Sequence, residues 1–244
     1  MKILVCVTNV PDTISKIAFT DQNTKFDKTG ITFICGPYDD YALSRAVELK
    51  EQTGGSLTVL NVGDADSEQM LRKCLAIGAD DAIRVNCEPT DSYFVAQQIA
   101  NLAKEGNYNL IMMGRESIDY NGGIVHGMVG EMLNIPSFSP VMKLEIEGDK
   151  AKMYREIEGG KEEIEAVLPI VVGCQEPIAE WKIPNMKGIM TARSKPLKVV
   201  EPAGENLTIT NNYTLPSPKG AVKMIDASNA GQLIELLRSE AKVL

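Results

Sequence analysis

The residues best suited to bind a ligand lie between Asn109 and Gly130. The run Leu110–Met113 has the length of a buried strand, and Gly114 turns the chain at its end. A polar loop follows, with Asp119, Asn121, Gly122 and Gly123. Apolar residues at helical spacing begin at Ile124. Helix starts offer free N–H donors and glycines let a ligand approach the backbone, so an anion- or nucleotide-binding corner is one interpretation. An ordinary strand-to-helix connection explains the pattern equally well.

Several other apolar runs also end in a small residue. Cys6, Gly36, Gly63 and Gly114 each stand where such a run gives way to a turn. Because the carboxyl ends of parallel strands line one crevice, we expect these positions to converge on a pocket that meets its ligand with backbone. The alternative is that glycine is common in α/β loops for purely local reasons.

Catalytic groups are poorly represented. The sequence has neither GxGxxG after the first strand nor GxxxxGK[ST], so the usual dinucleotide and phosphate loops are absent. His126 has no evident nucleophile partner, and we interpret it as structural. Cys6 and Cys174 are interpreted as small buried apolar residues. Asp119 is placed either to accept a ribose or amide hydrogen bond or to cap a helix.

Composition narrows the functional class. The chain has 244 residues, 44% of them hydrophobic, and a net charge of −8. An acidic surface repels nucleic acid, and no apolar run is long enough for membrane insertion. Five scattered cysteines without CxxC indicate free thiols and no metal site. Free thiols fit a reducing cytoplasm, and Met1-Lys2 leads straight into a strand without a secretory pattern. We therefore expect a cytoplasmic location, in a bacterium.

The elements that would position these residues alternate regularly. Apolar runs at 2–8, 57–62, 82–85 and 110–113 predict buried strands. Helical patterns lie between them, at 38–52, from Ser67 to Gly78, and from Thr90–Asp91 to Gly106. This order predicts an α/β fold with a doubly wound, mostly parallel sheet.

The pattern changes after Pro136. Residues 141–147 and 151–157 predict an antiparallel hairpin, 161–167 a further strand, and 168–173 a return to the main sheet. Residues 174–200 are expected to form a mostly exposed loop with one short helix at 188–192. Within this loop, Trp181 marks either a docking element or a loop folded back on its own domain. Residues 201–221 look like a tether, and 228–244 like an amphipathic helix that packs either on a partner subunit or back on its own sheet. We therefore expect a domain at 1–200 and an arm at 201–244.

Five segments together resemble the β subunit of electron transfer flavoproteins, and the similarity runs nearly end to end. They are Ala76–Asp80, Gly114–Asp119, Arg155–Gly160, Leu168–Val172 and Gly188–Leu197. The resemblance implies a Rossmann-like, adenine nucleotide hydrolase-like fold and an electron carrier subunit rather than a stand-alone enzyme. It implies a partner α subunit that makes most of the contacts to a bound FAD, with the β subunit lying against the flavin. It also implies donors of the acyl-CoA dehydrogenase type and acceptors of the quinone reductase type.

The resemblance also assigns residues. In the family the β crevice holds AMP, or a second FAD in flavin-bifurcating members. The corresponding positions here are Cys6, Gly36, Pro37, Tyr38, Asp39, Val62, Gly114, Arg115, Ser117, Ile118, Asp119, Asn121, Gly122, Gly123, Ile124 and Val125. The loop that docks on the donor corresponds to 174–196, with Met186 at the anchor position and Trp181 and Ile183 beside it. A glutamate near the subunit junction corresponds to Glu156.

This sequence departs from the family pattern at the crevice. Gly36-Pro37-Tyr38-Asp39 replaces Asn-Pro-Phe-Cys, and Thr8 replaces a lysine. Gly123-Ile124-Val125 lacks the amide and hydroxyl side chains that relatives supply after the aspartate, and Thr13 replaces the tyrosine that some carry near the flavin. These changes oppose AMP and leave a second FAD as the alternative occupant. A different class of protein, a universal-stress-like nucleotide-binding regulatory module, is the alternative function.

Overall fold

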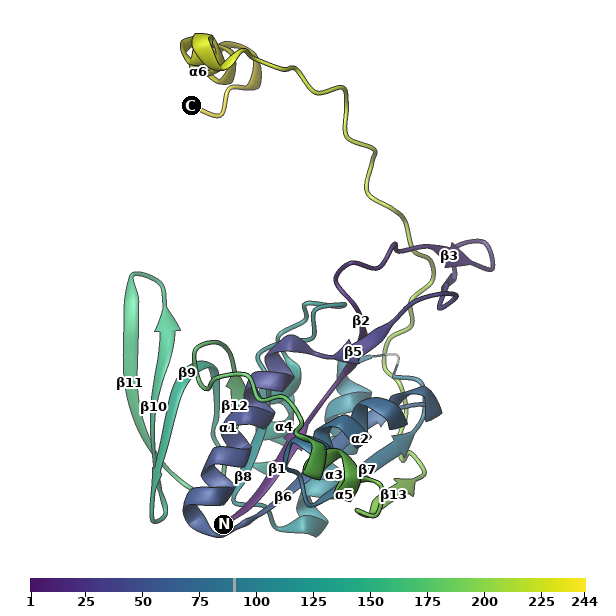
Figure 1. Ribbon diagram of the computed structural model, residues 1–244, viewed down its shortest axis with the longest axis vertical. Helices are drawn as coiled ribbons and strands as arrows, with labels where there is room; N and C mark the ends of the chain where they lie inside the picture. The colour runs from purple at the N-terminus through teal and green to yellow at the C-terminus, as the bar shows by residue number, and fades with distance from the viewer. Residues whose placement is uncertain (90) are drawn as a thin grey trace.

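The computed structural model describes residues 1–89 and 91–244. Its centre is a nine-stranded sheet in the order β11-β10-β9-β12-β8-β1-β6-β7-β13 (Figure 1). The strands are β1 (Lys2–Cys6), β6 (Ser56–Gly63), β7 (Asp81–Asn86), β8 (Leu110–Gly114), β9 (Ser137–Glu147), β10 (Lys150–Ile157), β11 (Gly160–Val167), β12 (Ile170–Cys174) and β13 (Leu197–Val200). β1 pairs in parallel with β6 on one side and β8 on the other, which makes its carboxyl end the topological switch point.

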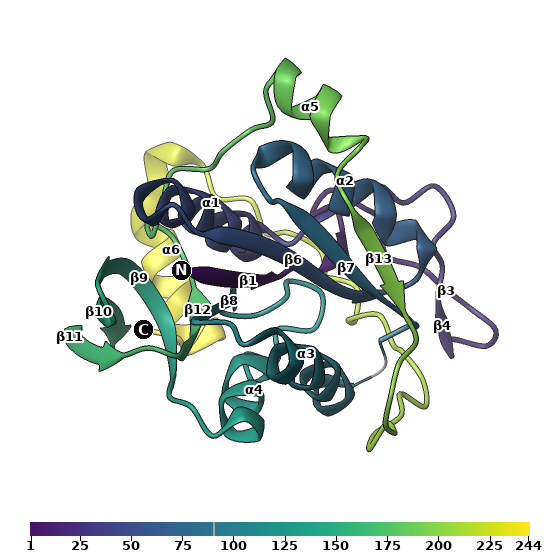
Figure 2. The same ribbon diagram turned by 90° about the horizontal axis from the view of Figure 1, so that it is seen from below.

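Helices cover both faces of this sheet. Figure 2 shows α1 (Pro37–Thr53), α2 (Glu68–Ile77) and α5 (Met186–Ala192) on one face, and α3 (Ser92–Gly106) and α4 (Val125–Leu133) on the other. The side chains of β1 alternate accordingly: Ile3 and Val5 belong to the first core, and Leu4 and Cys6 to the second. The predicted doubly wound, mostly parallel sheet is confirmed.

Local sequence explains where the helices begin and end. Pro37 fits the first turn of α1, where no backbone donor is needed, and Gly54 ends the helix with φ +65°. Asp91 caps α3 by accepting a hydrogen bond from the Phe94 amide. Thr90, expected to begin this helix with Asp91, lies outside the described residues.

The predicted hairpin after Pro136 is confirmed. β10 pairs antiparallel with both β9 and β11, while β12 returns to lie parallel between β8 and β9. The irregular segment near the N-terminus forms two small ladders. One joins β2 (Asn9–Pro11) to β5 (Phe33–Cys35), and the other joins β3 (Phe19–Thr20) to β4 (Lys25–Phe26).

One expectation for residues 174–200 was wrong. Leu197–Val200 is not loop but the edge strand β13, parallel to β7. Four partly exposed residues after Pro196 are too few for alternation to stand out in a sequence. The short helix expected at 188–192 is confirmed as α5, and it begins two residues earlier.

Residues 201–244 leave the sheet as an extended arm (Figure 1). Gln98 fixes its start by bonding both the N–H and the C=O of Ala203, and Asp91 accepts from the Leu207 and Thr208 amides. Tyr213 stacks on Phe19 with ring centroids 4.8 Å apart.

The terminal helix is shorter than expected. It consists of a 3₁₀ turn (Ala227–Asn229), α6 (Ala230–Leu236) and a wider turn that ends at Ala241. In the described part of the chain no helix is long and apolar enough to cross a membrane.

Candidate functional site

The crevice at the switch point is held together by one carboxylate. Asp39, in the first turn of α1, accepts hydrogen bonds from the amide of Thr8 at 2.8 Å and from its hydroxyl at 2.5 Å. It also accepts from the Gly114 amide at 2.7 Å. Thr8 follows β1 and Gly114 ends β8, so Asp39 joins two neighbouring strand ends to a helix start. Its side chain is buried, and burial raises its pKa to about 6 against the opposing effect of these donors.

Two glycines make room for this carboxylate. A methyl group on Gly114 would lie 2.7 Å from Asp39 Oδ1 and 2.7 Å from Tyr38 Cβ. At Gly36 it would lie 2.5 Å from Asp39 Oδ2 and 2.5 Å from the Thr8 hydroxyl. Of the four positions predicted to converge, Gly36 and Gly114 meet at Asp39, and close packing around this carboxylate accounts for both glycines. Gly63 packs instead against Asn61 and Ser67.

Arg115 connects the crevice to the hairpin. Its guanidinium lies over the Tyr38 ring, 4.9 Å from the centroid. Nη1 donates to Gln175 Oε1 at 3.0 Å, and Gln175 Nε2 donates to Glu156 at 2.8 Å. Glu156 therefore lies on the crevice side of the molecule, linked to Arg115 through a buried amide. Sequence reasoning missed Thr8 and Gln175 as site residues because their role depends on partners 31 and 60 positions away.

The loop before α4 presents unpaired backbone donors. The N-cap Ile124 makes no side-chain bond, and the helix ladder begins with the Met128 amide. Within the described residues the amides of Gly122 to Gly127 have no hydrogen-bond acceptor. Asp119 is engaged locally and accepts from the Ser117 hydroxyl at 2.5 Å and from the Tyr120 amide at 3.0 Å. Backbone donors of this kind fit an anionic group.

Other predicted positions wall the same rim. Cys6 and Val62 are buried at neighbouring strand ends, and burial raises the Cys6 pKa well above its usual range. Ile118 and Val125 are half-buried. Asn61, which sequence reasoning overlooked, is buried with its Nδ2 donating to the Val7 carbonyl, while its Oδ1 has no partner in the described chain. The crevice thus offers glycines, free amides and one buried acceptor.

Nucleophilic and metal chemistry finds no support here. His126 lies in α4, 3.3 Å from the Ser137 hydroxyl, and burial lowers its pKa. Burial raises the pKa of the Cys174 thiol, which opposes a nucleophilic role. Among residues 1–89 and 91–244, no three His, Cys, Asp or Glu side chains are grouped to hold a metal ion.

The loop at 174–196 starts near the crevice, where Gln175 lies, and then runs along α1 and α2. Its middle is folded back: the Lys182 amide donates to the Ser44 hydroxyl at 3.0 Å, and Lys73 Nζ lies 5.5 Å from the Trp181 ring centroid. Ile183 and Met186, by contrast, are 71% and 76% exposed. Trp181 is thus half-exposed and attached to its own domain, while Ile183 and Met186 project from it.

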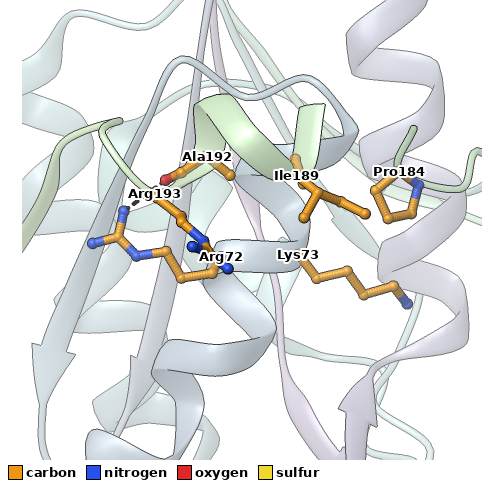
Figure 3. A pocket seen from close by; sticks show the side chains of 7 residues that line it. Arg72, Lys73, Pro184, Ile189, Ala192 and Arg193 are labelled. Atoms are coloured by element: carbon orange, nitrogen blue, oxygen red, sulfur yellow. Dashed lines mark hydrogen bonds between the residues drawn. The ribbon is translucent and has the colours of Figure 1, made fainter. Parts of the chain in front are cut away.

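A cavity of about 460 Å³ adjoins this loop, between α2 and α5 (Figure 3). Its lining residues are Arg72, Lys73, Ala76, Pro184, Ile189, Ala192 and Arg193. A second cavity of about 460 Å³ lies between residues 12–18 and 29–32, beneath the β3–β4 hairpin. Neither of these two cavities lies at the strand ends around Asp39, where the sequence predicted a pocket.

Comparison with known proteins shows the family to which this chain belongs. The profile of the electron transfer flavoprotein domain matches residues 24–205. The chain therefore belongs to the electron transfer flavoprotein family.

Full-length relatives are more specific. The chain is 35% identical over 259 residues to the electron transfer flavoprotein subunit beta of Bacillus subtilis, with all of both chains covered. It is 32% identical over 249 residues to the subunit beta of Syntrophomonas wolfei, covering 100% of this chain and 98% of that one. It is also 33% identical over 208 residues to the acryloyl-CoA reductase electron transfer subunit gamma of Anaerotignum propionicum, covering 82% and 78%. Within the family it is a β subunit, an electron carrier subunit, as its sequence indicated.

Proposed function

We propose that this chain forms a cytoplasmic heterodimer with an α subunit, and that the α subunit makes most of the contacts to a bound FAD. The full-length match to β subunits carries this proposal. When bound, FAD supplies the electron-accepting and electron-donating chemistry. The residues of this chain wall one side of the assembly and present a surface to the electron donor.

The terminal arm is proposed as the main attachment to the α subunit. From residue 214 onward it leaves the body of the molecule, and its apolar side chains are largely exposed. They include Leu215, Val222, Met224, Leu233 and Ile234. Exposed apolar residues at this density indicate a surface that another chain covers. This supports the division into a domain at 1–200 and an arm at 201–244, although Tyr213 still contacts the β3–β4 hairpin.

We propose that electrons come from acyl-CoA or related dehydrogenases and pass to a quinone reductase or another acceptor. The name of the Anaerotignum propionicum relative refers to a CoA-linked reductase, which supports partners of this kind. The exposed Ile183 and Met186 would dock on the donor through their apolar side chains, while Trp181 holds the loop in place. Glu156, fixed by Gln175, is proposed to face the subunit junction.

The crevice is proposed to accept an adenine-bearing group through backbone donors rather than side chains. Asp39 already accepts three hydrogen bonds from its own chain, so its carboxylate is not available as a ligand contact. The amides of Gly122 and Gly123 are free of partners in the described chain and fit a phosphate. The amide and hydroxyl side chains that relatives supply after Asp119 are missing, which still opposes AMP; a second FAD is the alternative occupant.

Co-purification with the α subunit tests the proposal. The pair is expected to show flavin absorption in the visible range, and mass spectrometry of the ligand released on denaturation identifies any nucleotide. A pair that binds no flavin at any loading would contradict the proposed function. The universal-stress-like alternative predicts self-dimerisation and ATP binding without an α subunit, and family membership gives it no support.

A further inference from the structure

The cavity between α2 and α5 combines an apolar wall with positive charge. Ala76, Pro184, Ile189 and Ala192 provide the apolar atoms, and Arg72, Lys73 and Arg193 provide the cations. Figure 3 shows Arg72 and Lys73 rising from α2, with Ile189 and Ala192 above them on α5. Three cations thus line one cavity of a chain whose net charge is −8.

Two of these cations lack a carboxylate. The sequence contains seven arginines. Arg45, Arg84, Arg115 and Arg155 each pair with a glutamate of this chain. Arg72, Arg193 and Arg238 have no such pair among the described residues, and the first two line the same cavity. The positive charge here is therefore left uncompensated within the chain.

Arg72 is also held in place. Its Nη1 donates to the Ala192 carbonyl at 2.9 Å and to the Lys195 carbonyl at 2.8 Å. Neutral carbonyl oxygens orient a guanidinium without cancelling its charge. Lys73 lies between the Trp181 ring and Asp40, 3.7 Å from that carboxylate. A guanidinium fixed beforehand loses less entropy when it binds a carboxylate, so the cavity is arranged to receive an anion.

The same face carries the most exposed apolar side chains of the docking loop. Ile183 and Met186 project beside the cavity, and Met190 of α5 is 72% exposed. Pro184 of the loop and Ile189 of α5 line the cavity, so a protein that packs on Ile183, Met186 and Met190 lies next to it. The group that fills the cavity is therefore expected to belong to that protein.

We propose that this cavity receives an acidic side chain of the electron-donor protein, paired with Arg72 and Arg193. The inference rests on the proposed function and adds to it: docking is apolar at Ile183 and Met186 and ionic at the cavity. Because the charge is concentrated at one recess, it also steers an acidic surface toward the loop.

Steady-state reduction of the flavin-loaded heterodimer by its donor tests this. Arg193→Glu is expected to raise the KM for the donor about tenfold with kcat unchanged, and to flatten the fall of kcat/KM with ionic strength. Arg193→Met, which removes only the charge, should give an intermediate KM. Lys104→Glu makes the same charge change on α3, across the sheet, and is expected to leave KM unchanged. A donor in which one surface carboxylate is replaced by lysine should restore the KM of Arg193→Glu.

Other outcomes separate the two proposals. If the unaltered complex is reduced by its donor and Arg193→Glu has the same KM and salt dependence, the ionic contact is wrong and the proposed function stands. If the flavin-loaded complex accepts no electrons from any such donor, both are wrong. Micromolar binding of inorganic phosphate, measured by calorimetry and lost in Arg193→Glu, would overturn the assignment to a protein side chain and indicate a site for a small anion.

Discussion

The carboxylate of Asp39 accepts a hydrogen bond from the amide of Gly114, 75 residues further along the chain. The bond fastens the first turn of α1 to the last residue of β8 at the point where the sheet order reverses. Thr8 completes the arrangement from the end of β1. Asp39 is buried and already accepts three hydrogen bonds from its own chain. We therefore expect it to fix the shape of the crevice rather than to contact a ligand.

The pH dependence of stability should reveal this carboxylate. Burial raises its folded pKa to about 6 from 3.8, so the folded state holds the proton more tightly than the unfolded chain between these pH values. Its contribution is therefore most favourable below about pH 4 and is lost as pH rises through about 6. Relative to Asp39→Asn, the wild type is expected to lose about 1–3 kcal/mol of unfolding free energy between pH 4 and pH 7. Urea denaturation of both proteins across this range measures the difference.

The comparison of two proteins cancels the titration of all other groups. The Asp39→Asn variant has no charge to bury at this position, so its own pH profile supplies the baseline. An advantage of the wild type that instead grows with pH would mean that the three hydrogen bonds outweigh burial and that the folded pKa lies below 3.8.

Gly114→Ala should destabilise the protein through steric conflict. The new methyl group would meet Asp39 Oδ1 and Tyr38 Cβ at 2.7 Å, and neither belongs to a side chain that can move freely. We expect a loss of about 1–3 kcal/mol in the free energy of unfolding. Gly127→Ala is the matched control, since nothing lies within 4 Å of a methyl group there and the position is helical. It should be neutral or stabilising by up to about 1 kcal/mol. Equal losses of unfolding free energy in the two variants would show that Asp39 and Tyr38 move aside without cost and that the steric conflict is absent.

Much of the fold was predictable from the sequence because its strands are buried on both faces. Leu110–Gly114 and Ile170–Cys174 are continuous apolar runs, and glycine or proline stands near their ends. β13 was not predictable, because four edge residues bury too little surface to impose a pattern. The resemblance supplied the family and the list of crevice positions.

The sequence could not reveal which crevice residues serve the fold. The resemblance listed Asp39 among the crevice positions, but its partners Thr8 and Gly114 come together only when β1 and β8 pair. The same is true of Gln175, which follows β12 and reaches Arg115 at the end of the neighbouring β8 and Glu156 on β10, beyond β9. Trp181 admitted two interpretations until the contacts of its loop with α1 and α2 were visible.

Met186→Glu should weaken the docking of the electron donor. Met186 is 76% exposed at the start of α5, so a charge there disturbs little within the chain, but it would have to be desolvated under a partner. We expect the KM for the donor to rise at least about tenfold while flavin content stays unchanged. Val167→Glu, on the exposed strand β11 at the opposite edge of the sheet, is the control. Equal loss of flavin and of reduction in Met186→Glu would show that the loop is structural.

Ser44→Ala should loosen the same loop without touching its exposed tip. The buried Ser44 hydroxyl donates to the Asp40 carbonyl and accepts the Lys182 amide, so it fastens the loop to the middle of α1. Without the Ser44 hydroxyl, the Lys182 amide loses its hydrogen-bond acceptor, which weakens the attachment of the loop to α1 by about 1 kcal/mol. Trp181 is the only tryptophan of the chain, so its fluorescence reports on the adjacent segment directly.

We expect the fluorescence anisotropy of Trp181 to fall and the KM for the donor to rise about twofold to fivefold, because a looser loop must be ordered on docking. The value of kcat at saturating donor should not change, since Ser44 lies away from the crevice. Thr53→Ala is the matched control: on the same helix, its hydroxyl likewise donates to a carbonyl four residues earlier, at Leu49, but it holds no loop. Unchanged anisotropy in Ser44→Ala would mean that the remaining contacts, of Lys73 with Trp181 and of Lys182 with Glu48, are enough to hold the loop against α1 and α2.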